Sequence, residues 1–364
     1  MKKIILSAAV AAVCAAPLAA MADNNLYGQM RYSFNSVDDK DNGKDGMSGN
    51  DNVSLFGLKG SAGDDVKAFY HLQTGAAADG NAGRAFNQRF YFAGLSGDFG
   101  KVAYGRMTNA YKFDGFKLDP FYNMSHIGVD GKFTAGVATY GLSPATNGFT
   151  DNALQYTSPA FSGVKVNLGI YIDDSNQDDH GTNAGISWSN DGINLGVQYA
   201  SNAKNAATIP GLVKDGDAVR VHGGYKAKGW SVGFSYETVD ENVAAAPAVN
   251  AVTVTTDQAT TLVITEASAA VAGSTGSTNY MYLVGRYNVT EKTEAVLSVG
   301  TVDPDKGAKN AGAEGTGMTF GLFQTVAPKT QVYATFSQAD LDAQGAEDPS
   351  VFSIGAIHKF GFGG

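Results

Sequence analysis

The charged residues between positions 86 and 130 are the best candidates for functional chemistry in this chain. Arg89 and Arg106 lie in two short alternating segments, and Asp114 and Asp119 follow in a segment without a clear period. Positive and negative side chains that face each other across a narrow space can sort ions by charge. Such side chains can also form local ion pairs or stabilise turns. The region therefore indicates electrostatic selection or structural pairing, and no bond-making step.

The histidine and cysteine residues do not have the spacing of common metal or nucleophile sites. No histidine has a second histidine four residues away, and the five are scattered: His71, His126, His180, His222 and His358. The only cysteine is Cys14. Residues 41–46 partly match a calcium-binding loop, but Asn52 stands where the twelfth position needs a glutamate. We therefore expect no enzyme activity, metal or cofactor.

Short strands with one polar and one apolar face are the elements that would position these charges. In residues 26–34, Met30 and Tyr32 alternate with Arg31 and Ser33, which is the period of a strand. A tilted strand of about 9–11 residues can cross a bilayer. Sixteen strands are predicted: 26–34, 53–60, 66–74, 86–95, 101–106, 153–158, 164–172, 182–189, 193–200, 218–227, 230–239, 279–288, 293–302, 315–325, 330–338 and 351–360.

The gaps between these segments alternate in length. Short gaps carry turn residues: 159–163, 190–192, 227–229, 289–292 and 327–329. Long polar gaps lie between them: 173–181, 201–217, 240–278, 303–314 and 339–350. Turns at one end and loops at the other are typical of a membrane β-barrel with an even number of strands. Closure of the barrel leaves no strand edge unpaired in hydrocarbon. We therefore predict an all-β fold, a transmembrane antiparallel barrel.

One long segment, residues 106–150, differs from the other outward gaps. It follows a hairpin in which Arg89 alternates with Phe90, and we expect Phe90 to face outward. The segment is rich in Gly, Asp, Asn and aromatic residues, and it carries acids directly after Arg106. We expect it to fold into the lumen as a long third loop and to form the filter.

Residues 240–278 form a second unusual gap, rich in Ala, Val and Thr. We expect a long extracellular loop. Residues 252–254 and 262–264 could pair as a hairpin outside the barrel, or they could extend the barrel to eighteen strands.

The first 22 residues have the pattern of a cleaved signal peptide. Lys2 and Lys3 precede an apolar run over residues 4–20, and residues 20–22 read Ala-Met-Ala. Without these two lysines the chain has 24 basic and 35 acidic residues, which changes the formal net charge from −9 to −11. This excess of acids argues against nucleic acid as a partner. We expect an exported protein with a single domain over residues 23–364.

The sequence from Gly94 to Arg106, GLSGDFGKVAYGR, resembles the hairpin before the third loop of the general trimeric porins of Gram-negative outer membranes. Residues 26–28 and 355–360 resemble the first and last strands of the same family. The resemblance implies a homotrimer in outer-membrane lipid that passes small hydrophilic solutes and ions by diffusion. It also implies a terminal aromatic residue that the outer-membrane assembly machinery reads, and Phe360 and Phe362 both qualify.

The family resemblance further implies a pore constriction in which arginines on the barrel wall face acids on the third loop. The wall candidates are basic residues: Arg31, Lys67, His71, Arg89, Arg106, Arg220 and Arg286. The loop candidates are Asp114, Asp119 and Asp130. Each could instead line a wide part of the lumen or stabilise a turn, and Lys112 and Lys117 could pair with the loop acids. The net charge favours cations, but charges at the entrance and at the constriction can oppose each other.

Two alternatives to a general porin stay open. One is a solute-selective outer-membrane channel. The other, from a different class, is a secreted β-rich adhesin without a pore.

Overall fold

A computed structural model describes residues 24–77, 79, 85–175, 178–240, 252–255, 261–265, 276–305, 313–342 and 347–362. The expected signal peptide, residues 1–22, and most of the loop 240–278 lie outside the described residues.

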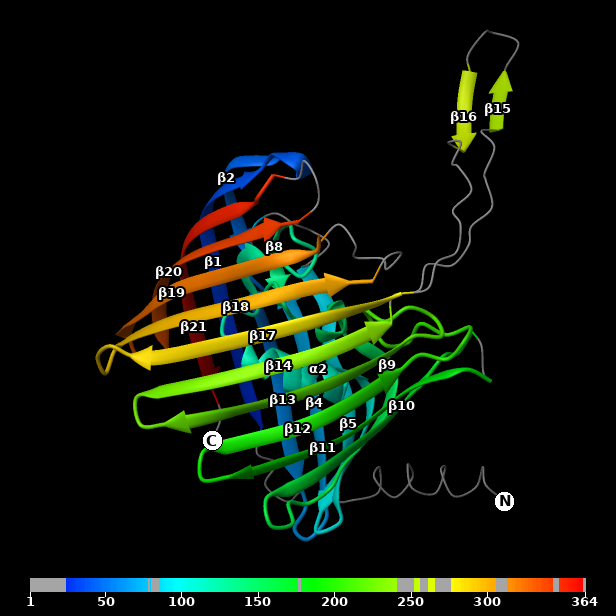
Figure 1. The fold of residues 1–364 in the computed structure, drawn as a ribbon. Helices are drawn as coiled ribbons and strands as arrows, with labels where there is room; N and C mark the ends of the chain where they lie inside the picture. Colours follow the sequence, from blue (N-terminus) through cyan, green and yellow to red (C-terminus); the bar gives the residue numbers. More distant parts are fainter. Residues whose placement is uncertain are drawn as a thin grey trace.

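Sixteen antiparallel strands form a closed barrel (Figure 1). Closure is made by β1, which pairs with β21 on one side and with β3 on the other. Each of the sixteen predicted strands falls on one of these, so this prediction is confirmed. Their bounds are β1 (Asn25–Asp39), β3 (Leu55–Ala62), β4 (Lys67–Ala76), β5 (Ala85–Gly97), β6 (Gly100–Met107), β9 (Thr150–Thr157), β10 (Val164–Ile172), β11 (His180–Asn190), β12 (Ile193–Ser201), β13 (Asp217–Ala227), β14 (Trp230–Asp240), β17 (Ser277–Asn288), β18 (Thr293–Pro304), β19 (Gly315–Ala327), β20 (Thr330–Leu341) and β21 (Ser350–Phe362).

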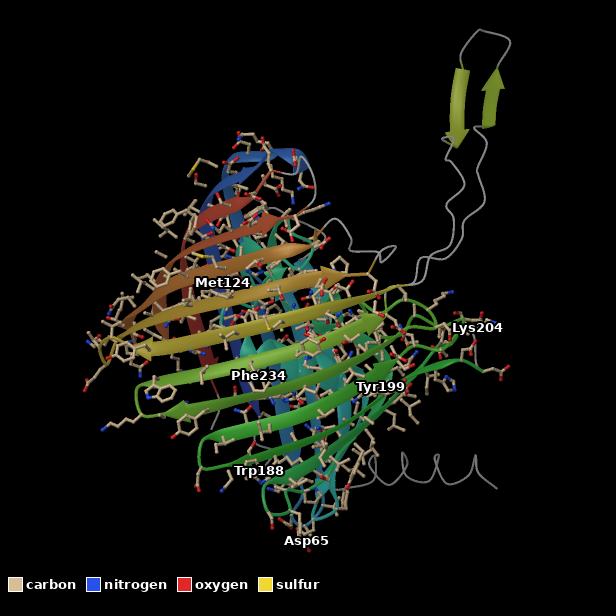
Figure 2. The ribbon with its side chains drawn as sticks, viewed as in Figure 1. Asp65, Met124, Trp188, Tyr199, Lys204 and Phe234 are labelled. Atoms are coloured by element: carbon tan, nitrogen blue, oxygen red, sulfur yellow. The ribbon has the colours of Figure 1, made fainter. Side chains whose placement is uncertain are left out.

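The two ends of the barrel differ as the gap lengths predict. Figure 2 labels Asp65 at the end with short turns and Lys204 in a long loop at the opposite end. Leu26 of β1 pairs with Phe362 of β21, so the first strand begins where the last one ends, at the short-turn end. An even number of strands produces this arrangement.

The outer and inner faces of the strands carry different side chains. On β14, Val232, Phe234 and Tyr236 are exposed on the outer face, whereas Ser235 and Glu237 are buried inside. An apolar exterior is what a lipid-facing barrel requires, because hydrocarbon offers no hydrogen-bond partners. None of the helices among the described residues is long and apolar enough to span a membrane.

A β-bulge corrects the expected orientation of Phe90. The pairing of β4 with β5 shifts register after Gln73. Because of this shift, Phe90 and Arg89 both point inward: the Phe90 ring stacks on His71 with 4.8 Å between centroids, and Arg89 Nε donates to Gln73 Oε1 at 2.8 Å. A two-residue period cannot anticipate such an insertion.

The first strand is longer than predicted. Residues 35–39 continue β1, a 3₁₀ turn covers Lys40–Asn42, and β2 (Lys44–Asp51) pairs back onto β1. The turn between them uses the positive φ of Gly43, 66°. Apart from Val37 and Met47 this hairpin has no large apolar side chain, so its sequence looks like a linker.

The strands β15 (Val252–Thr255) and β16 (Thr261–Thr265) pair only with each other in the part of the chain that the structure describes. The prediction of a separate hairpin is thus confirmed, and extension of the barrel to eighteen strands is wrong.

The long third loop lies inside the barrel. It contains α2 (Ala110–Leu118), the short hairpin β7 (Met124–Ile127) and β8 (Phe133–Val137), and the 3₁₀ turn Pro144–Thr146. Buried loop residues such as Phe121 and Leu142 form one apolar cluster with inward residues of distant strands, among them Tyr282 and Phe323. The hydrophobic core of this protein is therefore the contact between loop and wall.

We predict that Gly300→Ala destabilises the packing of this loop against the barrel wall. A Cβ at Gly300 of β18 would overlap the Tyr140 carbonyl and Gly141 of the loop, and overpacking of this kind costs about 1–3 kcal/mol. Gly285→Ala on the neighbouring strand is the matched control, because a Cβ there meets nothing within 4 Å. Urea unfolding in detergent measures both. Equal stability of the two variants would contradict the close approach of loop and wall.

Candidate functional site

The helix α2 begins the segment of the loop that crosses the lumen. Asn109 caps it, since its Oδ1 accepts from the N–H of Lys112 at 2.7 Å, and its Nδ2 donates to Thr150 Oγ1 at 3.3 Å. This N-cap explains where the helix starts. The helix then presents Tyr111 to one side of the wall.

A buried ion pair between Arg220 of β13 and Glu237 of β14 anchors the helix. The two side chains are 0% exposed and 2.8 Å apart. Arg220 also donates to the Tyr111 carbonyl, and Glu237 accepts from the Tyr111 hydroxyl at 3.0 Å. Glu237 further accepts from Ser143 Oγ. Arg220, which the sequence places in the constriction, is therefore buried in an anchor and not exposed to the lumen.

Polar wall residues also hold the middle of the loop. Arg31 Nη1 donates to the carbonyls of Tyr122 and Asn123 at 2.9 and 3.0 Å. Ser33 Oγ lies 3.0 Å from Ser125 Oγ. These bonds satisfy backbone and hydroxyl groups that would otherwise be buried without partners. Arg31 faces inward as predicted, and at least part of its guanidinium is used for anchoring.

The loop acids do not line up opposite the wall arginines. Asp119 is 4% exposed and accepts from Phe121 N, Thr139 N and Tyr282 OH at 2.9, 2.9 and 3.1 Å. It stabilises the turn after α2. Asp130 is exposed in the turn between β7 and β8. The structure gives neither acid the predicted position.

Asp114 points from α2 toward another part of the wall. It accepts from Gln198 Nε2 at 2.5 Å, and Lys117 Nζ lies 3.6 Å away. His222 Nε2 is 3.9 Å from the same carboxylate. The charge of Asp114 is thus largely compensated within its own surroundings.

Three basic side chains, Arg89, Arg106 and Lys112, surround the ring of Phe149; we call them the basic cluster. Their cationic groups lie 4.9, 5.4 and 4.5 Å from the ring centroid. Arg106 also forms an ion pair with Asp151, in which Nη1 donates to both carboxylate oxygens at 2.7 Å. The structure therefore brings together Arg89 and Arg106, as predicted, but adds a lysine of the loop in place of an acid.

Burial, together with the nearby charges of Arg89 and Arg106, lowers the pKa of Lys112 to about 7. Its ammonium donates to the Gly148 carbonyl at 2.5 Å. The pKa falls because both the loss of hydration and the neighbouring positive charges disfavour the charged form of the lysine, and no carboxylate among the described residues pairs with it.

The other wall candidates lie toward the short-turn end. Lys67 is exposed as the first residue of β4, and the His71 ring contacts the Tyr27 hydroxyl. Arg286 pairs with Glu294 on the next strand at 2.9 and 2.8 Å. The structure does not bring these three residues to the basic cluster.

Open space lies on both sides of the loop. At the loop end, Arg89 and Asn87 line a cavity of about 160 Å³. At the short-turn end, Lys101 and Lys117 line a cavity of about 480 Å³ beneath α2. Neither Lys101 nor the anchor residue Glu237 is a candidate from the sequence. Glu237 shares the polar face of its predicted strand with Ser231 and Ser235, and that alternation is the signal that could have found it. Lys101 shares its face with Ala103 and Gly105, so no polar alternation marks it.

We predict that Glu237→Gln weakens the anchor of α2. It leaves the buried Arg220 guanidinium without its anion, which costs up to about 3–5 kcal/mol. Glu294→Gln is the matched control, since it breaks the partly exposed pair with Arg286, worth about 0–1 kcal/mol. Urea unfolding and the current noise of single channels report the difference. If both variants behave alike, the ion pair of Arg220 does not hold the loop.

Comparison with known proteins agrees with this architecture. A family profile described as Gram-negative porin matches residues 8–344. The major outer membrane protein P.IB of Neisseria gonorrhoeae is 26% identical over 346 residues, which are 85% of this chain and 95% of that protein. An outer membrane porin of Bordetella pertussis is 27% identical over 236 residues, 57% of this chain and 58% of that porin, so this match spans less than two thirds of the relative.

Solved structures have the same fold. The anion-selective porin from Comamonas acidovorans superimposes with a TM-score of 0.69 at 18% identity, over 93% of this chain and 100% of that one. OmpT of Vibrio cholerae, folded in vitro, gives a TM-score of 0.62 at 16% identity, over 93% of this chain and 98% of that one. The profile match, the closed barrel and the loop inside it lead to one conclusion: the chain belongs to the Gram-negative porin family and forms a channel in the bacterial outer membrane.

Proposed function

We propose that this porin passes small hydrophilic solutes by diffusion and favours anions at its narrowest passage, beside the basic cluster. The proposal rests on where the three acids of the loop lie, because none of them faces the basic cluster as a free charge. Asp119 is buried in backbone hydrogen bonds, Asp114 is compensated by Lys117, and Asp130 lies in an exposed turn.

The charges that are left near Phe149 are mainly positive. Among the described residues, no carboxylate lies within ion-pair distance of Arg89 or Lys112, and only Arg106 has an anionic partner. Charges act over about 8 Å at physiological salt, so the acids that can weaken the cluster are the near ones: Asp151, which pairs with Arg106, and Asp51, which lines the same small cavity as Arg89. The acidic net charge of the chain is therefore a poor guide to selectivity.

We also propose that export and assembly proceed as the resemblance to the porin family implies. Residues 1–22 act as a cleaved signal, and the mature barrel assembles as a homotrimer. Phe360 pairs with Gly28 at the closing seam of the barrel, which supports a role in recognition by the assembly machinery. Phe362 is the second candidate, in the last position of β21.

We predict that Arg89→Gln lowers the preference for anions. Loss of one charge that contributes on the order of 1 kcal/mol changes the permeability ratio of chloride to potassium by up to about fivefold. Lys329→Gln removes the same charge in an exposed short turn and serves as the control. Reversal potentials across a planar bilayer in a KCl gradient measure both. An unchanged ratio in Arg89→Gln, or a native channel that prefers potassium, would contradict the proposal.

The selectivity should also depend on pH. Because the pKa of Lys112 is lowered to about 7, its ammonium is charged at pH 5.5 and mostly neutral at pH 8.5. The preference for chloride is therefore expected to fall as the pH rises through this window. Lys112→Met removes the titrating group and should flatten the profile. A slope that persists in Lys112→Met would assign the effect to another group.

A further inference from the structure

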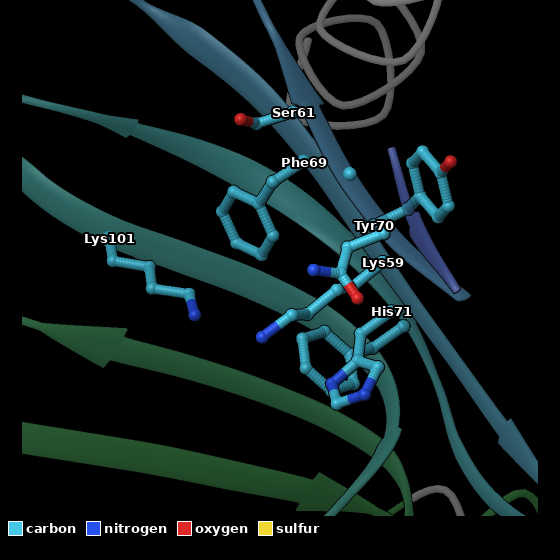
Figure 3. A pocket seen from close by; sticks show the side chains of 9 residues that line it. Lys59, Ser61, Phe69, Tyr70, His71 and Lys101 are labelled. Atoms are coloured by element: carbon cyan, nitrogen blue, oxygen red, sulfur yellow. The ribbon is translucent and has the colours of Figure 1, made fainter. Parts of the chain in front are cut away.

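A second group of positive charges lies at the short-turn end, away from the basic cluster. Two adjoining cavities of about 440 and 480 Å³ share His71, Phe92 and Lys101 in their walls; we call the joined space the vestibule. In Figure 3 the side chains of Lys59 and Lys101 extend toward the same open space, with Phe69 and His71 beside it.

The charge of the vestibule is positive. Lys59 and Lys101 line it from the wall, and Lys165 and Lys117 line the part beneath α2. Among the described residues, no carboxylate comes within ion-pair distance of Lys59, Lys101 or Lys165. The acid that borders the space, Asp114, has Lys117 at 3.6 Å and is 14% exposed. An anion that enters the vestibule thus meets four ammonium groups, and the carboxylate that borders the space, Asp114, already has Lys117 as its neighbour.

Aromatic rings lie directly beside these ammonium groups. Lys101 Nζ is 4.4 Å from the centroid of Phe69 and 5.8 Å from that of Phe92. Lys117 Nζ is 3.7 Å from the centroid of Phe113. Cation–π contacts hold the lysine side chains over the rings. Phe92 and Phe113 also line the cavity, where an apolar group can pack against them.

We propose that the vestibule is a binding site for small organic anions that carry an aromatic ring, with aromatic carboxylates as the ligand class. The carboxylate pairs with Lys101 and Lys59, and the ring packs against Phe92. The volume is in the range of small-molecule sites, about 300–1,000 Å³. The proposal rests on the porin function above, since the ligand reaches the vestibule through the lumen.

The combination of lysines with phenylalanines separates this site from a general attraction of anions. Ammonium groups alone attract acetate and benzoate equally. Only a site that also buries the ring favours benzoate, because apolar area removed from water adds about 25 cal/mol per Å². The ring contribution and the charge contribution are therefore separable by substitution.

The test compares benzoate with acetate as blockers of chloride current in single channels. We expect benzoate to reach half block at a concentration at least about tenfold lower than acetate, a factor that corresponds to 1.4 kcal/mol. Phe92→Ser keeps the charges but removes the apolar ring from the cavity wall, so it should remove most of this difference. Lys101→Gln should weaken block by both anions. Lys67→Gln removes a lysine at the same end that lines neither cavity, and it should leave both values unchanged.

Equal block by benzoate and acetate in the native channel would overturn the site, while a preference for chloride in the same recordings would leave the proposed function intact. A loss of block in Lys67→Gln as large as in Lys101→Gln would also overturn it, because diffuse charge would then be sufficient. Unblocked conductance in KCl shows for every variant that the channel has formed.

Discussion

A loop that lies inside a barrel must find partners for its backbone N–H and C=O groups, and this requirement organises the lumen. Three sets of wall residues meet it: Arg31 supplies donors to the carbonyls of Tyr122 and Asn123, Ser337 Oγ accepts from Ile127 N, and Arg220 donates to the Tyr111 carbonyl. An unpaired backbone group in such a place costs several kcal/mol. The wall is therefore polar for two reasons, to face water and to hold the loop.

This double use of polar residues decides which charges are left for solutes. Arg220 and Glu237 neutralise each other in the anchor, and Asp119 is occupied by the turn after α2. Arg89 keeps its charge, and Lys112 is charged below its pKa of about 7; neither has a carboxylate within ion-pair distance among the described residues. The lysines of the vestibule continue this pattern toward the short-turn end. The passage is therefore positive because the contacts that anchor the loop neutralise the acids near it, even though acids outnumber bases in the chain.

The strands were predictable because their signal is local. Alternation over a few residues places Arg31 and Ser33 on one face, and it holds wherever one side of a strand meets lipid. It failed at Phe90, where a bulge shifts the register, and at residues 35–51, where Val37 and Met47 are the only large apolar side chains. The roles within the site were less accessible to sequence reasoning. They depend on contacts between distant residues, such as Tyr111 with Glu237 or Asp119 with Tyr282, which no spacing pattern encodes.

The claim that the barrel wall holds the loop inside the lumen is tested most directly by a cross-link between loop and wall. Ser33 Oγ of β1 and Ser125 Oγ of β7 are 3.0 Å apart, a separation that suits a disulfide if both residues are cysteine. The only native cysteine is Cys14, in the expected signal peptide. In the Ser33→Cys/Ser125→Cys variant we expect a disulfide to form under mild oxidation, with conductance and reversal potential equal before and after reduction. Failure to cross-link, or a conductance that drops when the bond forms, would contradict a loop held in the lumen by the barrel wall.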